Sequence, residues 1–439
     1  MLLPLDNPSV AAESPAASEF FDWGRRLGFE RSELASGAEC VRYFTVPDLA
    51  TGRDLVCHAT KEQRRKRQAA FFHPAIAVRA RLGQGLHDRG EAFVFADGEI
   101  GEGDLRGLSR HFPTHLKATS VLEKTVRAGE IWDLSVRGAV WGLDEMEELY
   151  SLLNVGRLVL EPGASVTIQG NVFTLLCQEL VAGEGSRVCI LPTPFSVDFR
   201  RGPHQGLAGV HGRDGATGRA GQRASVEPCL LGHRLSMPIE QADLHGGDGE
   251  AAGDGARGGD ARNGGMSKLA EITIRRIHGR VIVFGQAGAG GHGGRGGDGG
   301  RGGDGGDGGP GFRTMEGILH AGRAGNGGHG GDGGHGGNGG SGGISSNIYV
   351  CVREEDRHKV ECVSLASEAG LGGAAGGGGF GGRAGTACVG SQVYECGQRG
   401  KDGEPGVAGR PGVTGRRRPG PWIFLNEAAV AHEEKETLT

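Results

Sequence analysis

The residues that could carry chemistry form two regular rows in the glycine-rich half of the chain. Their members are His292, Arg295, Asp298, Arg301, Asp304 and Asp307 in the first row, and Asn326, His329, Asp332, His335, Asn338 and Ser341 in the second. Successive members are three residues apart, which is about 9 Å in an extended helix that rises 3.1 Å per residue. Metal ligands must converge within about 2–2.5 Å of the ion, so a single row cannot form a metal site. We therefore expect exposed interaction rows and no cofactor; the charged side chains pair between neighbouring segments or with another subunit, or are simply solvated. A metal site would need ligands from a neighbouring rod.

The glycines around these rows recur every three residues over 285–309 and again over 322–343. An α-helix, with 3.6 residues per turn, and a strand, with a period of two, would not keep these glycines on one side. The left-handed polyproline-II type of helix has three residues per turn and does so. Most triplets contain a second glycine, so two faces of each rod are bare backbone. Because such a helix has no internal hydrogen bonds, its amides must pair with neighbouring rods.

The chain contains six glycine runs of this kind. We number them in chain order: run 1 is 206–221, run 2 is 246–264, run 3 is 285–309, run 4 is 322–343, run 5 is 370–385 and run 6 is 397–415. In run 2, Ala252 and Ala261 replace two of the regular glycines. Residues 270–284 and 347–365 alternate apolar and polar residues about a central turn, which predicts β-hairpins. The sequence thus predicts rods that run out and back, while the β segments return to a common sheet.

A collagen triple helix also needs glycine at every third position. Proline is nearly absent from runs 3 and 4, however, and a second glycine has no use in a triple helix, whose axis needs only one. Run 6, with GEPGVAGRPG, stays open as a collagen-like trimeric stalk. The period and the doubled glycines resemble those of polyglycine-II bundle proteins, such as the snow-flea antifreeze protein and the glycine-rich tip adhesins of phage tail fibres. The resemblance covers roughly residues 202–415 and implies an intrachain bundle of about six polyglycine-II helices.

The N-terminal part looks like an ordinary globular cap. Apolar β runs at 40–46, 54–59 and 92–96 flank one polar segment at 61–72, which predicts a small α/β or α+β cap. The polar segment carries a basic cluster, formed by Lys61, Arg64, Arg65, Lys66 and Arg67. No aromatic residue lies between these side chains, so we expect a solvated helix face, and we do not expect nucleic acid as a partner.

The pattern of residues 119–200 predicts the central part of the fold. Short strands separated by glycines follow one another over 119–200, which suits successive turns of a β-solenoid, with an antiparallel sandwich as the alternative. A helical face of Met146, Leu149, Tyr150 and Leu153 predicts a capping helix at 144–154. We expect a mainly β fold with these parts: a flexible arm at 1–18, the cap at 19–118, the solenoid-like region at 119–200, the glycine-rich bundle with interleaved hairpins at 201–421, and a C-terminal strand and polar tail at 422–439.

Composition limits the partners, the compartment and the cysteine chemistry that we expect. A net charge of -5, from 48 basic and 53 acidic residues, gives no broad basic field. The N-terminus has no basic n-region and no apolar stretch approaches about 18 residues, so we predict neither a secretory signal nor a membrane span. We expect a protein that is cytoplasmic, or that is exported or assembled by a leaderless route. Nine cysteines without CxxC spacing argue against a zinc module. Cys351 with Cys362, and Cys388 with Cys396, could each close a disulfide, and buried thiols are the alternative.

No catalytic constellation is evident in the sequence. The GxGxxG strings of the runs lack a strand-turn-helix context, and no GxSxG, HExxH or Walker motif occurs in such a context. We expect a non-enzymatic structural protein whose rigid bundle builds a fibre, coat or appendage, as a homo-oligomer or with an assembly partner. The first alternative is an adhesin that binds a glycan or a cell surface through the loops at the rod ends, 222–245, 312–321 and 386–396. The second is a carbohydrate-active β-solenoid enzyme.

Overall fold

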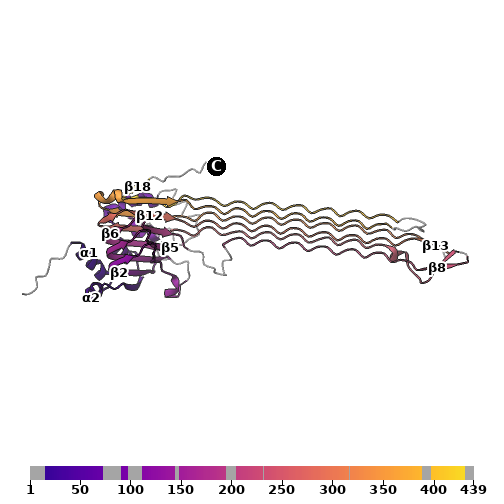
Figure 1. The fold of residues 1–439 in the computed structure, drawn as a ribbon, viewed down its shortest axis with the longest axis horizontal. Coiled ribbons are helices and arrows are strands. Elements are labelled where there is room, and N and C mark those ends of the chain that lie inside the picture. Colours follow the sequence, from indigo (N-terminus) through magenta and orange to yellow (C-terminus); the bar gives the residue numbers. More distant parts are fainter. Residues whose placement is uncertain are drawn as a thin grey trace, which may run out of the picture.

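The computed structural model describes residues 15–72, 90–96, 111–143, 148–193, 204–230, 232–315, 317–387 and 397–430. Strands outnumber helices, which confirms the prediction of a mainly β fold. Figure 1 shows two parts: a base of stacked strands with helices beside it, and a long extension in which the six glycine runs lie side by side.

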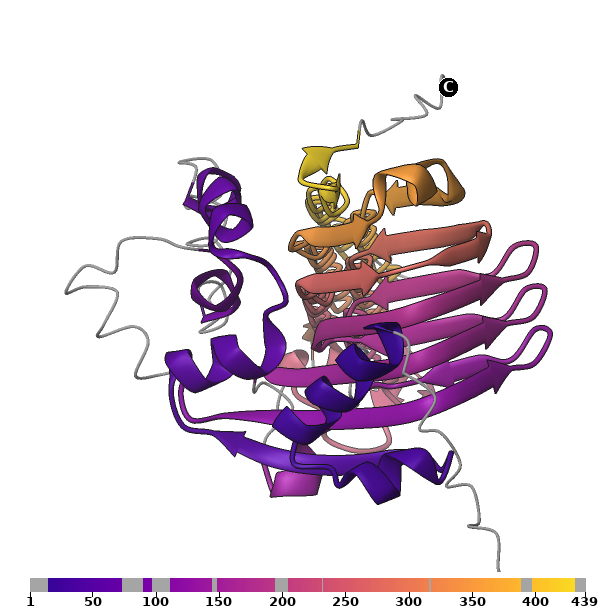
Figure 2. The same cartoon turned by 90° about the vertical axis from the view of Figure 1, so that its left-hand side faces the viewer.

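The larger sheet of the base has nine strands, most of them parallel. Their spatial order is β1 (Cys40–Val46), β2 (Thr114–Val126), β4 (Leu149–Leu160), β6 (Val172–Ala182), β10 (Ala270–Ile274), β15 (Ile348–Val352), β17 (Ile423–Leu425) and β18 (Ala428–Ala429), with β11 (Ile277–Gly279) also beside β6. The strands from β2 to β17 are parallel to their neighbours, whereas β1 and β18 pair antiparallel at the two edges. Figure 2 shows that the stack follows the order of the chain.

The second sheet has five strands, all parallel. They are β3 (Ile131–Asp133), β5 (Ser165–Gln169), β7 (Arg187–Leu191), β12 (Val281–Gln286) and β16 (Val360–Leu365). The chain alternates between the sheets, so that each pass adds one strand to each of them: β2 leads to β3, β4 to β5, β6 to β7, β10 to β12 and β15 to β16. Their apolar side chains share one core, in which Leu153, Val166, Ile272 and Val283 have no exposed surface.

Parallel pairing overturns three sequence-based predictions. The capping helix at 144–154 is wrong, because its described residues from Leu149 onward form β4. That strand lies between β2 and β6 and is buried on both faces, which gives an unbroken apolar stretch that also fits a helix. The hairpins at 270–284 and 347–365 are wrong, because the two halves of each segment belong to different sheets. The antiparallel sandwich is likewise not the fold of the base.

Helices of the N-terminal part cover one face of the larger sheet (Figure 2). They are α1 (Pro15–Arg26), α2 (Arg31–Ala35), α3 (Leu49–Val56), α4 (Lys61–Phe72) and α6 (Gly90–Phe95), and three short 3-10 helices lie elsewhere: η1 (Gly138–Trp141), η2 (Gln241–Leu244) and η3 (Glu354–Lys359). The predicted β run at 40–46 is confirmed as β1. Those at 54–59 and 92–96 are wrong, since they fall in or directly after α3 and in α6. Short apolar runs fit a buried helix as well as a strand.

Each pair of glycine runs is inserted between a strand of the five-stranded sheet and the next strand of the nine-stranded sheet. Runs 1 and 2 lie between β7 and β10, runs 3 and 4 between β12 and β15, and runs 5 and 6 between β16 and β17. At the far end, two hairpins connect the first two pairs of runs: β8 (Val226–Cys229) with β9 (Gly232–Leu235), and β13 (Phe312–Thr314) with β14 (Gly317–Leu319) (Figure 1). Odd runs therefore lead away from the base and even runs return to it.

Backbone hydrogen bonds join each run to its neighbours, with N to O distances of 2.7–3.1 Å. Run 3 is central. Its amides donate to runs 2 and 5, as from Gly294 to Gly259 and from Gly293 to Leu371, while its carbonyls accept from runs 1 and 4. Run 4 bonds in the same way with runs 2, 3, 5 and 6. Within the described residues, run 1 bonds only with runs 2 and 3, and run 6 only with runs 4 and 5 of the same chain.

The number of glycines in a triplet follows the number of neighbouring runs. In the central run 3, a Cβ added at Gly297 would lie 2.0 Å from the carbonyl oxygen of Val210, and one at Gly296 would lie 2.0 Å from that of Gly334. Both positions must therefore stay bare. Runs 1 and 6 have neighbours on one side only, and one glycine per triplet leaves enough bare backbone for them. Glycine doubling thus indicates which runs lie at the centre.

Candidate functional site

The two predicted interaction rows lie on opposite outer faces of the set of runs. Their side chains are exposed or half-buried, while the glycines between them are mostly buried. In the first row, Arg295 and Arg301 donate to Asp298 and Asp304 of the same row at 2.8 and 2.9 Å. The expected pairing of arginine with aspartate between rods therefore occurs within one rod instead.

The acceptor side chains of the first row bond to the backbone of run 5. The pairs are His292 Nδ1 with the Leu371 N–H at 2.9 Å, Asp298 Oδ1 with Gly377 at 2.7 Å, Asp304 Oδ1 with Arg383 at 2.8 Å, and Asp307 Oδ1 with Thr386 at 2.7 Å. The Gly377 N–H lowers the pKa of Asp298, and the nearby Arg295 and His211 lower it further. The Arg383 N–H lowers the pKa of Asp304 in the same way. The row thus caps amides that no neighbouring carbonyl reaches.

The second row does the same for run 6 without interruption. One amide in each of six successive triplets donates to it: Lys401 to Asn326, Glu404 to His329, Val407 to Asp332, Arg410 to His335, Val413 to Asn338 and Arg416 to Ser341, at 2.7–3.1 Å. Members of the row in turn donate their own N–H groups to run 2, as Asp332 does to Asp254 at 2.8 Å. The result is a set of transverse columns, such as Asp254–Asp332–Val407, that tie three runs together.

The transverse columns account for the residue types in the rows. Every capping residue offers an acceptor atom on a short side chain, either a carboxylate, amide or hydroxyl oxygen or the Nδ1 of a histidine. Each histidine in this role must carry its ring proton on Nε2, because its Nδ1 accepts the amide proton. No group of three His, Cys, Asp or Glu residues among the described residues could hold a metal ion. We conclude that the rows stabilise the run packing.

The distal tip is formed by the two hairpins and η2. Strand β9 contacts β13, since the Met315 N–H donates to the His233 carbonyl at 3.0 Å and the Cys229 Sγ lies 3.3 Å from the Met315 Sδ. Leu244 of η2 is completely buried and its carbonyl accepts the N–H of Gly309 at 2.7 Å, which closes the end of run 3. Large apolar side chains are nevertheless exposed around it, by 49% to 105%: Leu230, Met237, Met315 and Ile318.

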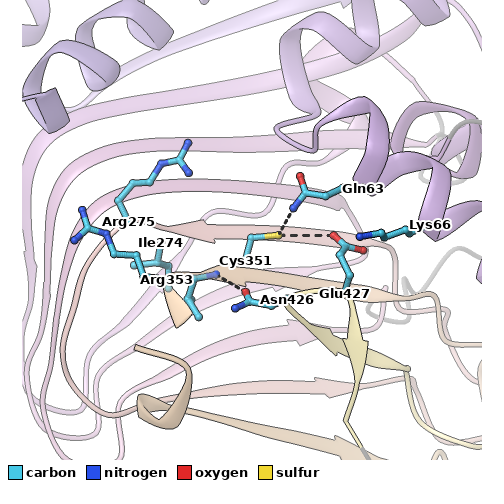
Figure 3. A pocket seen from close by; sticks show the side chains of 9 residues that line it. Gln63, Lys66, Ile274, Arg275, Cys351, Arg353, Asn426 and Glu427 are labelled. Atoms are coloured by element: carbon cyan, nitrogen blue, oxygen red, sulfur yellow. Dashed lines mark hydrogen bonds between the residues drawn. The ribbon is translucent and has the colours of Figure 1, made fainter. Parts of the chain in front are cut away.

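A cavity of about 380 Å³ lies at the opposite end, in the base (Figure 3). It opens at the carboxyl ends of β10 and β15, whereas the runs return to the amino ends of these strands. Its lining comes from α4, from the ends of the two strands and from the turn between β17 and β18: Gln63, Lys66, Ile274, Arg275, Cys351, Val352, Arg353, Asn426 and Glu427. We call it the base cavity.

Comparison with known protein families, curated proteins and solved structures found no match to this chain.

A buried ion pair network, which we call the floor of the base cavity, joins the cavity lining through Glu427. Arg67 is buried, and it donates to Glu271 at 2.6 Å and to Glu427 at 2.8 Å, with its guanidinium 4.1 Å from the ring centre of Tyr349. Burial alone would lower the pKa of Arg67, but the two carboxylates outweigh it and raise the pKa. Burial raises the pKa of Cys351 to about 12, so this thiol is protonated and unreactive at neutral pH.

Sequence reasoning missed this network, because it assigned Arg67 to a solvated helix face. A usable signal was Glu271, which interrupts an apolar strand and demands a buried cation. Cys351 and Cys362 are both free, half-buried thiols, so the disulfide between them is wrong. The Cys388 and Cys396 pair lies outside the described residues. Within the described part of the chain, no helix is long and apolar enough to cross a membrane.

Proposed function

We propose that the protein is a non-enzymatic structural protein, in which a β-solenoid base carries an intrachain bundle of six polyglycine-II helices that acts as a rigid spacer. The observation that supports this proposal is the hydrogen-bond ladder between the runs, in which triplet after triplet bonds the same neighbouring runs. A helix of this type rises about 3.1 Å per residue, so run 3 alone spans roughly 80 Å. Neighbours on several sides resist bending of the central runs.

The sides of the bundle favour a spacer over a fibre that grows laterally. A further run can approach only against bare backbone, yet the outward positions of runs 1 and 6 carry side chains, among them the exposed Leu207, Val210 and Val407. Pro405 and Pro411 of run 6 also lack an N–H to donate. Side chains and prolines protect the edges of β-sheets in the same way. We therefore propose that partners contact the two ends.

The distal tip is the first candidate contact. Four large apolar side chains are exposed there: Leu230, Met237, Met315 and Ile318. Apolar side chains gathered at one place mark interaction surfaces. The described tip residues, 222–230, 232–245, 310–315 and 317–321, include no Trp or Tyr on which a sugar ring could stack, and their one Phe, Phe312, is half-buried. This favours a protein partner over the glycan of the adhesin alternative, and the predicted homo-oligomer makes a second copy of the chain the first partner to test.

An enzymatic role finds no support at the base cavity. A glycosidase needs two carboxyl groups that are available to the substrate. The two acidic residues of the network beside this cavity, Glu271 and Glu427, are both bound by Arg67. The half-buried Cys351 thiol is protonated and is not a nucleophile. The network beside the base cavity thus holds its carboxylates in fixed pairs.

The spacer is tested by the shape of the full chain in solution. We expect small-angle scattering and negatively stained micrographs to show a particle with a compact base and a straight extension, longer in total than the roughly 80 Å of run 3. A flexible-coil profile, or a compact particle without an extension, would refute the spacer.

The tip contact is tested in the same micrographs at increasing protein concentration. We expect pairs of particles joined through the ends of their extensions, and we expect Leu230→Ser with Ile318→Ser to abolish them. Leu371→Ser with Val413→Ser is the matched control, since it removes two exposed apolar side chains from the sides of the bundle. Pairs that persist in the tip variant, or particles joined along their sides, would contradict the tip contact while leaving the spacer in place.

A further inference from the structure

The base cavity has a charge pattern that the spacer does not explain. Three cationic side chains line it, those of Lys66, Arg275 and Arg353, against the one carboxylate of Glu427. That carboxylate is already occupied, because Arg67 donates to it from Nε at 3.1 and 3.2 Å and from Nη2 at 2.8 Å. Because Arg67 is shared between Glu271 and Glu427, this network keeps one net negative charge, against the three positive charges of the lining. Figure 3 shows Arg275 and Arg353 on one side and Lys66 on the other.

Two of the three cations are available for exchange with a ligand. Lys66 and Arg353 pair with exposed carboxylates, those of Glu62 at 3.1 Å and Glu355 at 3.4 Å, whereas the half-buried Glu19 holds Arg275 through two hydrogen bonds. The three cationic side chains keep between 45% and 62% of their surface exposed. The exposed pairs of Lys66 and Arg353 contribute only about 0–1 kcal/mol each, so an anion in the cavity can replace these two carboxylates at little cost.

One wall of the cavity is a two-residue hairpin turn. Asn426 and Glu427, between β17 and β18, have φ angles of 49° and 64°, as both central residues of a tight antiparallel hairpin require. The turn is fixed by its side chains: Asn426 accepts the N–H of Val352 at 2.9 Å and donates to Glu354 at 3.0 Å, while Glu427 is held by Arg67. These contacts keep this wall of the cavity in one shape.

We propose that the base cavity binds an oxyanion ligand with two or more negative charges, a phosphate group or a pair of carboxylates. Two guanidinium groups match the bidentate geometry of such oxygens, and the ammonium of Lys66 adds a third positive charge. The neutral amide of Gln63 lies at the rim as a further donor. Because the cavity lies at the end of the base away from the runs, the ligand occupies the end of the molecule opposite to the tip.

Calorimetric titration of the full chain tests the site with two defined probes, inorganic phosphate and citrate. We expect one saturable site, with affinity that falls as salt rises and falls at least tenfold in Arg353→Gln and in Lys66→Gln. Arg257→Gln is the matched control: Arg257 forms an exposed pair with Asp260 at 2.7 Å on run 2, far from the cavity, and its loss should leave binding unchanged.

The two probes separate the sources of the oxyanion. Tighter binding of phosphate assigns the site to a phosphorylated ligand, and binding of citrate alone assigns it to carboxylates. Thermal unfolding of each variant without ligand confirms that the fold is intact. Absence of saturable binding of either probe up to about 10 mM, or equal binding by Arg353→Gln and wild type, would overturn the proposal. Neither result depends on the shape or the tip contact of the spacer.

Discussion

Replacing one central glycine by alanine tests whether close backbone contact holds the runs together. The N–H of Gly297 donates to Ala256 at 2.9 Å, and its carbonyl accepts from Gly334 at 2.8 Å. In Gly297→Ala the new Cβ would lie 2.0 Å from the oxygen and 2.5 Å from the carbon of the Val210 carbonyl. Both are backbone atoms of run 1 and cannot rotate away, so run 1 and run 3 must move apart.

The size of the effect follows from three contributions. Overpacking of a tight interior costs about 1–3 kcal/mol. Distortion of the two hydrogen bonds removes up to about 0.5–1.5 kcal/mol for each. Alanine lowers the conformational entropy of the unfolded chain, which stabilises the folded state by about 0.4–1 kcal/mol. We expect Gly297→Ala to lower the free energy of unfolding by roughly 1–5 kcal/mol.

Gly377→Ala provides a matched control on run 5. The nearest atom to its added Cβ would be the Asp298 Oδ1 at 3.7 Å, an ordinary contact. Only the effect on the entropy of the unfolded chain remains, so the free energy of unfolding of this variant should equal that of wild type or exceed it by about 0.4–1 kcal/mol. Urea unfolding gives the two free energies, and hydrogen exchange should show faster exchange in runs 1 and 3 of Gly297→Ala alone. Equal stability of the two variants would refute close backbone contact as the source of cohesion.

Three further predictions address the transverse columns, the floor of the base cavity and a buried carboxyl group. Asp332→Leu removes the acceptor of the Val407 N–H, so we expect faster exchange of that amide by NMR and a loss of about 0.5–1.5 kcal/mol. Arg67→Met leaves Glu271 buried without its cation, which should lower the free energy of unfolding in urea by about 3–5 kcal/mol. Burial raises the pKa of Glu91 from 4.5 to about 7. Its folded form binds protons more tightly than the unfolded chain, so this residue's contribution to stability is full below pH 4.5 and falls by roughly 3 kcal/mol as the pH rises through 7. Thermal unfolding should show that Glu91→Gln loses less stability than wild type between pH 4.5 and pH 8.

Each of these predictions has its own contrary result. Asp332→Asn keeps an acceptor oxygen and should leave the Val407 amide protected; equal exchange in Asp332→Leu and Asp332→Asn would remove the capping role. A stability of Arg67→Met within about 1 kcal/mol of wild type would mean that Glu271 does not depend on Arg67. The same pH dependence in Glu91→Gln and wild type would assign that dependence to other groups.

Local periodicity made the runs predictable, because a period of three is visible within a single segment. The doubled glycines also predicted neighbouring rods, since each bare face needs a neighbour. The partners of individual residues were not predictable. Asp332 accepts the N–H of Val407 at a separation of 75 residues. Neither segment contains a signal that specifies which triplet of run 4 pairs with which triplet of run 6. That register is set by the strands of the base, from which the runs leave.

In the base, the strands were harder to predict than the runs. Strands buried on both faces lose the alternation of apolar and polar residues, so Leu149–Leu160 resembled a helix and the apolar helices α3 and α6 resembled strands. Among the functional candidates, the rows were visible as a pattern, but their role as amide caps depends on the neighbouring runs. Arg67 gave no local signal at all, because its partners come from β10 and from the turn after β17.

The constant spacing of the transverse columns restricts how this protein can change its length in evolution. Capping pairs keep fixed sequence separations: 87 residues between runs 1 and 3, 78 between runs 2 and 4, 79 between runs 3 and 5, and 75 between runs 4 and 6. A three-residue insertion in one run would shift every later pair in that run against unchanged partners. Related chains with longer or shorter extensions should therefore differ by the same number of triplets in all six runs, and single-run insertions should be confined to the loops at the tip.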